Sequence, residues 1–398
     1  MTHAALRPEI VARTRYVPRA DRPDDVDPLD ALGPDGFAWL HDGVGFVTAG
    51  VAARIPVGDV DRAHAEFSVD DAVGEPGTGV IAVGALPFDP CAPGEMIVPA
   101  TVVGRTAAGR TWMTEIEAVP PLPTAVSLQP TRFTVRRGMS REAWDDAVVQ
   151  ALAAIHSGAV EKVVLARDVH VTADEPFDLT RITRRLRVAQ PGCFVFALAG
   201  LVGASPELLV ARAGLDVWSR PLAGTTPRVD DAALADLAAS VKDAHEHRLV
   251  VDVIVEEFRA RCGASVHVAG PEIVRFSTLA HLATTISGRL PVATGDSALA
   301  FARALHPTPA VGGTPTAAAV ELIAALEADG RGRYAGPVGW VDAAGNGEFA
   351  LALRSAEVDG AEAVLRAGAG IVAGSDPDAE WDETEAKLAP MLAALIRP

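Results

Sequence analysis

The chain has 398 residues, of which 49% are hydrophobic and 22% charged, which is enough apolar material for one large core or two smaller ones. Its 52 acidic and 35 basic residues give a formal net charge of −17, which argues against nucleic acid or an anionic membrane surface as a partner. The three cysteines are far apart and form no CxxC pair. We therefore expect neither a disulfide framework nor a cysteine zinc site, and a reducing cytoplasm fits the chain.

The first third of the chain carries no chemical motif. Residues 1–28 contain several arginines but no long apolar run, and we expect a flexible N-terminus without a membrane span or a signal peptide. Residues 29–130 alternate short β-type runs with Gly, Pro and Asp, which predicts a β-rich part of the same fold. The proline-dense residues 120–130 predict an extended connection to the longer elements of residues 131–398.

A lysine is embedded in the strand predicted over residues 160–171. Period-two alternation places Lys162 on the same face as Val160 and Val164. Lys162 could be an ordinary lysine at the edge of a sheet. It could also be partly desolvated at a cavity, which would lower its pKa toward a value useful for a base.

A carboxylate lies at the mouth of another apolar strand. The turn Gly203-Ala-Ser-Pro-Glu-Leu delivers Glu207 between two predicted strands. A solvated turn carboxylate is one interpretation. In an apolar mouth the charged form would be disfavoured and the pKa raised, as a general acid requires.

Two predicted helices carry acidic residues three positions apart. One helix is expected over about residues 231–261, and the other begins at Pro377 after a strong N-cap signal. Charged helix faces are usually only solvated. If these two faces met, however, their carboxylates would repel one another unless a cation lay between them, and Mg²⁺ uses one or two carboxylates plus oxygens of a substrate. The residues concerned are Asp243 with Glu246, and Glu380 with Glu383, followed on the same face by Lys387.

An arginine ends an apolar strand in the hairpin predicted over residues 333–355. Arg354 could extend from the strand end into solvent. Alternatively it contacts a ligand, because the guanidinium fork suits a carboxylate through two parallel hydrogen bonds.

Nine motifs in one order resemble those of the chorismate-utilising enzymes, and among them the isochorismate synthases. Any one motif would be a weak signal, but together they carry a resemblance that spans roughly residues 140–392. The motifs are KVVLAR (162–167), GASPELL (203–209), PLAGT (221–225), KDAHEH (242–247), HLATTISG (281–288), HPTPAVGGTP (306–315), RYAGPVGW (333–340), ALRSA (352–356) and GAGIVAGSDPDAEWDETEAK (368–387).

The resemblance implies an α+β fold and an isomerase. The fold would have two stacked halves, each an antiparallel-rich sheet flanked by helices as in anthranilate synthase component I, with residues 131–398 as the chorismate-binding catalytic region. The enzyme would convert chorismate to isochorismate in a Mg²⁺-dependent reaction. Enzymes of this branch serve siderophore or menaquinone biosynthesis.

The same resemblance implies roles for individual residues. Lys162 would be the base that activates water for attack at C2 of chorismate, and Glu207 the acid that protonates the departing C4 hydroxyl. Glu246 and Glu383 would bind Mg²⁺ together with the ring carboxylate of the substrate, and Asp243 and Glu380 would support them. The residues expected to bind substrate are Tyr334 and Arg354 at the enolpyruvyl carboxylate, Gly368, Gly370 and Lys387 at a carboxylate, and Gly224, Thr225, His281 and Ala310 along the pocket.

Small differences favour one reaction among the relatives. Ammonia-using synthases typically carry a PxGTxSGAPK-like turn, whereas residues 306–315 read HPTPAVGGTP, so we expect no amidotransferase subunit. Ala310 stands where salicylate-forming lyases are expected to have threonine, which favours stopping at isochorismate. A salicylate synthase, which also eliminates pyruvate, is the alternative. Thr226 departs from the family, which often has Arg after PLAGT.

A non-catalytic ligand-binding or nucleotide-binding protein is a more distant alternative. GAGIVAG (368–374) nearly matches GxGxxG. The next helix begins only after Asp376 and its first turns are acidic, which would repel a pyrophosphate from that helix end.

Overall fold

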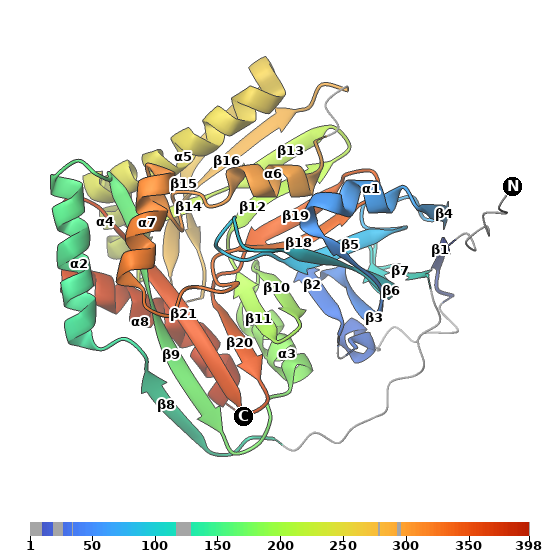
Figure 1. Cartoon of the computed structure of the whole chain (residues 1–398), viewed down its shortest axis with the longest axis horizontal. Helices are drawn as coiled ribbons and strands as arrows, with labels where there is room; N and C mark the ends of the chain where they lie inside the picture. The colour runs from blue at the N-terminus through green and yellow to red at the C-terminus, as the bar shows by residue number, and fades with distance from the viewer. Residues whose placement is uncertain are drawn as a thin grey trace, which may run out of the picture.

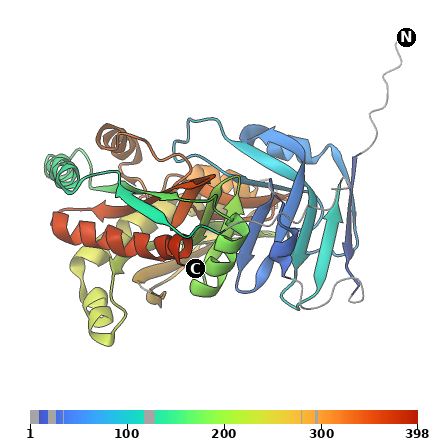
Figure 2. The same cartoon turned by 90° about the horizontal axis from the view of Figure 1, so that it is seen from below.

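Strands dominate the architecture. The computed structural model describes residues 10–18, 27–33, 35–116, 129–277, 279–292 and 296–397. Within these ranges 21 strands form one hydrogen-bonded network, whose neighbouring pairs are antiparallel except for β1 (Ile10–Tyr16) with β4 (Phe67–Asp71). The N-terminal strands, blue and cyan in Figures 1 and 2, stack at one end of the C-terminal elements.

The N-terminal part is built from short elements. Besides β1 and β4, its described residues contain η1 (Pro28–Ala31), β2 (Phe37–His41), β3 (Val44–Pro56), η2 (Val57–Asp59), α1 (Val60–His64), β5 (Ile81–Ala85), β6 (Glu95–Arg105) and β7 (Thr111–Glu115). Strands make up most of the elements in this part.

The C-terminal part adds the longer helices. No helix of the described residues is both long and apolar enough to cross a membrane. The elements are β8 (Phe133–Arg137), α2 (Arg141–His156), β9 (Lys162–Ala173), α3 (Leu179–Ala189), β10 (Phe194–Leu198), β11 (Leu201–Ser205), β12 (Leu208–Ala213), β13 (Asp216–Arg220), β14 (Leu222–Thr226), α4 (Asp231–Ala239), α5 (Val241–Cys262), η3 (Gly263–Ser265), β15 (His267–Arg275), β16 (Ala280–Arg289), α6 (Ala298–Leu305), β17 (Gly313–Thr314), α7 (Thr316–Leu326), β18 (Pro337–Asp342), β19 (Gly347–Leu351), β20 (Ser355–Asp359), β21 (Glu362–Ile371) and α8 (Pro377–Ile396).

The two parts share one sheet and one apolar cluster. Strand β2 pairs with β10, and β5 pairs with β18. Trp39 of β2 lies opposite Phe196 of β10, and both are buried in a cluster that also contains Trp340 of β18. Backbone hydrogen bonds and aromatic packing therefore both cross the boundary between the two parts.

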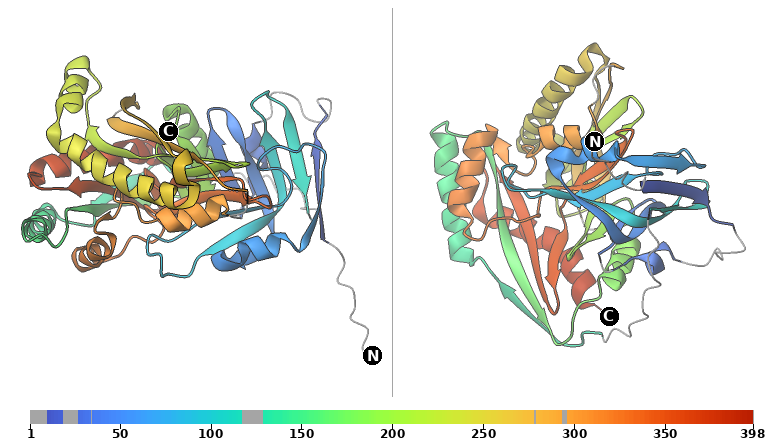
Figure 3. Two further views of the ribbon diagram at one scale, coloured as in Figure 1. Left: turned by 90° about the horizontal axis from the view of Figure 1, so that it is seen from above. Right: turned by 45° about the vertical axis from the view of Figure 1, so that its right-hand side comes forward.

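Strands β9 and β21 and helices α5 and α8 frame the region that carries the predicted site. β21 pairs with β9 along its whole length. Helix α8 packs against β21 and α2, while α5 packs against β14 and β16 (Figures 1 and 3). The predicted cap of α8 is present, since the side chain of Asp376 accepts hydrogen bonds from the backbone of Asp378 and Ala379, and Pro377 occupies the first helical position.

The expectation of a flexible segment over residues 1–28 is contradicted at residues 10–16. These residues form β1, which pairs with β4 and β7. Ala12 and Thr14 are buried, whereas Arg13 and Arg15 are exposed. The buried members of this period-two pattern are small residues, and arginines alternate with them. The sequence therefore shows no run of large apolar side chains that would predict a strand here. Residues 1–9 and 19–26, and most of the connection expected over 120–130, lie outside the described residues.

The single helix expected over residues 231–261 is two helices, so that expectation is wrong. Helices α4 and α5 meet at Ser240, whose ψ of 114° is extended. Its side chain accepts a hydrogen bond from the backbone N–H of Asp243 at 3.1 Å. Ser240 therefore ends one helix and caps the next, and it places Asp243 in the first turn of α5.

Candidate active site

One pocket gathers most of the residues that the sequence singled out. It has a volume of about 700 Å³, its open mouth included, and lies among β9, β14, β16, β21, α5 and α8. Sequence positions more than 200 residues apart thus meet at one place. The expected residues that line it are Glu207, Gly224, Thr225, Glu246, His281, Ala310, Tyr334, Arg354, Gly368, Gly370 and Lys387.

Lys162 lies directly behind this lining in an ion pair. Its side chain has no exposed surface, and its Nζ is 2.9 Å from Oε1 of Glu246, whose side chain is 14% exposed. A Cβ at Gly370 would lie 2.2 Å from that same oxygen and 3.1 Å from Cε of Lys162. Burial alone would raise the pKa of Glu246, but the Lys162 ammonium holds it below its usual value. Glycine at position 370 is therefore what lets the lysine and the carboxylate meet.

The acidic faces of α5 and α8 meet, and lysines neutralise them. Burial raises the pKa of Glu383, and the nearby charges of Glu380 and Glu246 raise it further against the opposing effect of Lys387. Each of the three carboxylates is paired with an ammonium. The pairs are Glu246 with Lys162 at 2.9 Å, Glu380 with Lys242 at 2.7 Å, and Glu383 with Lys387 at 2.7 Å.

Asp243 lies one turn before Glu246 on α5. Its Cβ would be 2.9 Å from a Cβ added at Gly224, which has a φ of 75°. Glycine at 224 thus allows β14 to approach the start of α5 closely, in a backbone conformation that other residues rarely adopt. This contact fixes the beginning of α5 beside the pocket wall.

Glu207 occupies the buried turn between β11 and β12. Only 4% of the residue is exposed, and burial raises the pKa of its carboxyl to about 7. A backbone hydrogen bond at Leu222 and the positive charges of Lys162, Lys387 and Arg354 oppose that rise. Near neutral pH the group therefore exists in both forms, and it can donate a proton.

Arg354 is held at the pocket by a histidine. Its Nη2 donates a hydrogen bond to Nε2 of His281 at 2.7 Å, and Nδ1 of His281 lies 3.0 Å from Oγ1 of Thr225. Burial lowers the pKa of His281 well below its ordinary value, so the ring is neutral and can accept from the guanidinium. Among the described residues, the buried Nη1 of Arg354 has no hydrogen-bond partner. The backbone of Arg354 is also in the left-handed region, with a φ of 49°. The strained backbone and the free Nη1 donor together indicate that the side chain is held in place for an anionic ligand.

Tyr334 and Lys387 approach the same stretch of β21. Burial raises the pKa of the Tyr334 phenol, which forms a hydrogen bond with the backbone of Gly368. Nζ of Lys387 donates to the carbonyl oxygen of Gly368 at 2.9 Å. Two polar side chains therefore converge on Gly368 from different elements, and both are turned toward the pocket interior.

Comparison with known proteins identifies the chain. The sequence profile described as chorismate binding enzyme matches residues 105–396. The chain belongs to this family. Isochorismate synthase DhbC of Bacillus subtilis is 37% identical over 344 residues, which cover 79% of this chain and 80% of DhbC. The chain lies in the isochorismate synthase branch, and the resemblance inferred from the motifs is confirmed.

Solved structures confirm the expected fold class of this chorismate-binding enzyme. MenF, the menaquinone-specific isochorismate synthase of Escherichia coli, superposes with a TM-score of 0.80 at 26% identity, covering 97% of this chain and 94% of MenF. Anthranilate synthase component I of Streptococcus pneumoniae has the same fold, with a TM-score of 0.70 at 23% identity over 91% of both chains.

The donor set of the chorismate-binding enzyme fits a hard divalent cation. Within the described ranges, no three His, Cys, Asp or Glu side chains converge as a ready-made metal cage. Mg²⁺ does not need one, because it keeps several waters and takes one or two carboxylates together with substrate oxygens. Glu246 and Glu383 supply two partly buried carboxylates whose charges affect each other, which is a donor set of this kind.

Sequence reasoning missed a buried arginine in the pocket wall. The guanidinium of Arg331 donates to the carbonyl oxygens of Val311 at 2.6 Å and Val164 at 2.7 Å. It also donates to both carboxylate oxygens of Glu327, and one of these, Oε1, accepts a second hydrogen bond from the backbone N–H of Ala166. This network ties β9 to the loop that carries Ala310. The i, i+4 spacing of Glu327 and Arg331 was the available signal.

Proposed function

We propose that this chorismate-binding enzyme is an isochorismate synthase that converts chorismate to isochorismate. The observation that carries the proposal is the presence, at one pocket, of the buried amino group of Lys162 and the buried carboxyl of Glu207, whose pKa is raised to about 7. An isomerisation that adds water at one ring carbon and releases a hydroxyl from another requires one base and one acid. The identity to DhbC supports the same reaction.

In the proposed mechanism these two residues move the protons. Nζ of Lys162 acts as a neutral amine, which takes a proton from the water that attacks C2 as the ring double bond shifts. Glu207 donates its proton to the C4 hydroxyl, which leaves as water. Since one water enters and one leaves, the reaction is an isomerisation with no net redox change.

The cationic side chains hold the two carboxylates of chorismate. Arg354 offers its free Nη1, and Tyr334 a buried hydroxyl, to the enolpyruvyl carboxylate. Lys387 and the backbone near Gly368 and Gly370 assist carboxylate binding. Thr225 and His281 act through the position of Arg354, since the neutral ring accepts the hydrogen bond that orients the guanidinium.

The enzyme is proposed to be magnesium-dependent, with Glu246 and Glu383 as the protein ligands. Glu380 and Asp243 would support them from the neighbouring turns of α8 and α5. When bound, the ion would supply positive charge to the ring carboxylate. The hard-oxygen chemistry of the donor set and the mutual effect of Glu246 and Glu383 support this assignment.

Product analysis tests the proposal. The protein is incubated with chorismate and Mg²⁺, and the products are separated by chromatography while pyruvate is measured in parallel. We expect isochorismate to accumulate without matching pyruvate. Pyruvate release that tracks chorismate loss would instead identify a salicylate synthase, and chorismate that binds without being consumed would identify a non-catalytic protein.

A further inference from the structure

Helix α8 presents two different faces to the protein. Glu380, Glu383 and Lys387 form the face at the pocket. Residues 381, 384 and 385 form a second face, centred roughly 120° further around the helix, since each residue advances an α-helix by about 100°. Contacts made by the second face therefore fix the direction in which Glu383 and Lys387 point.

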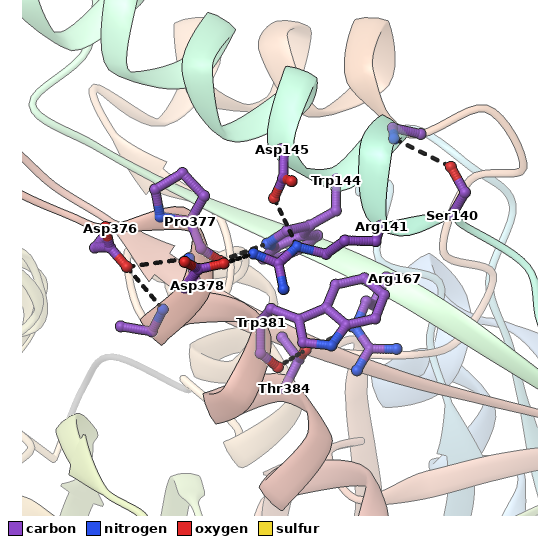
Figure 4. Close-up of polar contacts among 12 residues, drawn as sticks. Ser140, Arg141, Trp144, Asp145, Arg167, Asp376, Pro377, Asp378, Trp381 and Thr384 are labelled. Atoms are coloured by element: carbon purple, nitrogen blue, oxygen red, sulfur yellow. Dashed lines mark hydrogen bonds and ion pairs between the residues drawn. The ribbon is translucent and has the colours of Figure 1, made fainter.

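A single buried arginine contacts all three residues of this second face. The side chain of Arg167, from β9, has no exposed surface. Its guanidinium carbon lies 3.8 Å above the ring of Trp381, its Nε donates to Oγ1 of Thr384 at 2.7 Å, and its Nη2 lies 2.9 Å from Oε1 of Glu385. Figure 4 shows the guanidinium of Arg167 beside the Trp381 ring and Thr384.

Arginine is the residue type that can make these contacts together. A flat, delocalised guanidinium stacks on an aromatic ring and donates from several nitrogens in one plane, whereas an ammonium is a point charge. Thr384 continues the network, since its hydroxyl donates to the backbone carbonyl of Trp381 at 2.7 Å. The arginine is thereby locked to the backbone of α8 as well as to its side chains.

Helix α2 holds the beginning of α8 on the same side. Trp144 packs edge-on against Trp381, with ring centroids 6.2 Å apart, and its Nε1 donates to the carbonyl oxygen of Pro377 at 3.3 Å. Arg141 pairs with Asp378 (Figure 4). These contacts steady the first turn, but only Arg167 comes from β9, the strand that also carries Lys162.

We propose that Arg167 is a positioning residue that sets the rotation of α8 relative to β9, and so aligns Glu383 and Lys387 with Lys162. The contacts of Arg167 lie one turn or less from Glu383, so a loss of the stack or of the Thr384 hydrogen bond lets the helix turn about its axis. The kinetic part of this inference rests on the proposed isochorismate synthase reaction. The structural part does not.

The test compares Arg167→Met with wild type and with Arg132→Met, a control arginine whose side chain is 87% exposed. Hydrogen–deuterium exchange is measured over the whole chain, and kcat and the Mg²⁺ concentration for half-maximal activity are measured with chorismate. For Arg167→Met we expect faster exchange confined to residues 377–388, a kcat about tenfold lower and a Mg²⁺ requirement about tenfold higher, each corresponding to about 1.4 kcal/mol. Arg132→Met should match wild type in every measurement.

A second variant covers the case in which Arg167→Met does not fold. Thr384→Val keeps the shape of the side chain and the buried charge but removes the acceptor of the Arg167 Nε hydrogen bond. We expect it to fold, and to show the same local exchange and a smaller loss of kcat.

Unchanged kcat and exchange in the folded variants, or faster exchange spread over all helices, would overturn the proposal. If wild type forms no isochorismate, the proposed function fails, whereas the exchange result still decides the role of Arg167.

Discussion

Nζ of Lys162 lies 2.9 Å from Oε1 of Glu246, inside the protein and next to Gly370. This pair joins the residue proposed as the base to a residue proposed as a metal ligand. An ammonium with no exposed surface depends on such a partner, because a buried charge without one is strongly destabilising. A change in the charge of Lys162, or a movement of Glu246, therefore alters the surroundings of the other residue.

Replacement of Lys162 by alanine is expected to abolish turnover while chorismate binding largely survives. A positioned base contributes about 10²- to 10⁴-fold to a rate, so kcat should fall by about that factor. Arg354, Tyr334 and Lys387 remain to bind the carboxylates. Steady-state kinetics and equilibrium binding of chorismate measure the two effects. Unchanged kcat would remove Lys162 from the mechanism.

The activity is expected to decrease as the pH rises through about 7. Burial raises the pKa of Glu207 to about 7, so its carboxyl is mostly protonated below that pH and mostly ionised above it. A general acid acts only in the protonated form, and kcat/KM should fall about tenfold per pH unit on the alkaline side. The pH profile of kcat/KM measures this. Glu207→Gln should lose most activity and this alkaline limb, whereas a wild-type profile that stays flat up to about pH 9 would contradict the assignment.

A methyl group at position 370 is expected to inactivate the enzyme. In Gly370→Ala the new Cβ would lie 2.2 Å from Oε1 of Glu246, so the carboxylate must move away from Lys162. Overpacking of this kind costs about 1–3 kcal/mol of stability, and we expect more than about tenfold loss of kcat. Gly58→Ala is the matched control, because a Cβ there has no neighbour within 4 Å among the described residues. Equal activity of the two variants would show that the close approach at Gly370 is unimportant.

Removal of divalent metal is expected to stop the reaction. Activity should be lost in EDTA and return when Mg²⁺ is added in excess. Glu383→Gln keeps the size of the side chain but removes one charge of the proposed ligand pair, so the Mg²⁺ concentration needed for half-maximal activity should rise about tenfold or more. Full activity in EDTA would refute the metal assignment.

The stability of the fold is expected to decrease as the pH falls from about 6.5 to 4, in part because of His306. Burial lowers the pKa of His306 from 6.5 to about 4, so the folded state holds the ring neutral while the unfolded state takes up a proton. The contribution is complete above pH 6.5, and up to about 3 kcal/mol is lost as the pH falls to about 4. Urea unfolding at several pH values measures the slope, which His306→Gln should reduce. The exposed His156, changed to Gln, serves as the control.

Local signals in the sequence were sufficient for the elements that frame the site. Asp376 caps α8 as expected, because a capping side chain and the start of the helical pattern are adjacent in sequence. Glu207 lies immediately before β12, a position that can be read from the order of turn and apolar strand in the sequence. The break between α4 and α5 at Ser240 was missed. The residues on both sides have helical patterns, and only the extended backbone of Ser240 separates the two helices.

Contacts between distant elements could not be predicted in the same way. The pairing of Lys242 with Glu380 joins α5 to α8, and the stacking of Arg167 on Trp381 joins β9 to α8. The periodicity of the sequence does not show which faces of two distant elements meet, because their relative position depends on the register of the whole sheet. The family resemblance supplied expected roles for single residues, but not the pairing of each carboxylate with a lysine.

The hydrogen bonds between β2 and β10 and between β5 and β18 have a consequence for dissection of the chain. If the region before residue 131 were removed, β10 and β18 would each lose a neighbour and become open edges rich in apolar side chains. Such edges promote self-association. A fragment that begins at residue 131 is therefore expected to self-associate, and strands β2 and β5 need to be retained with it.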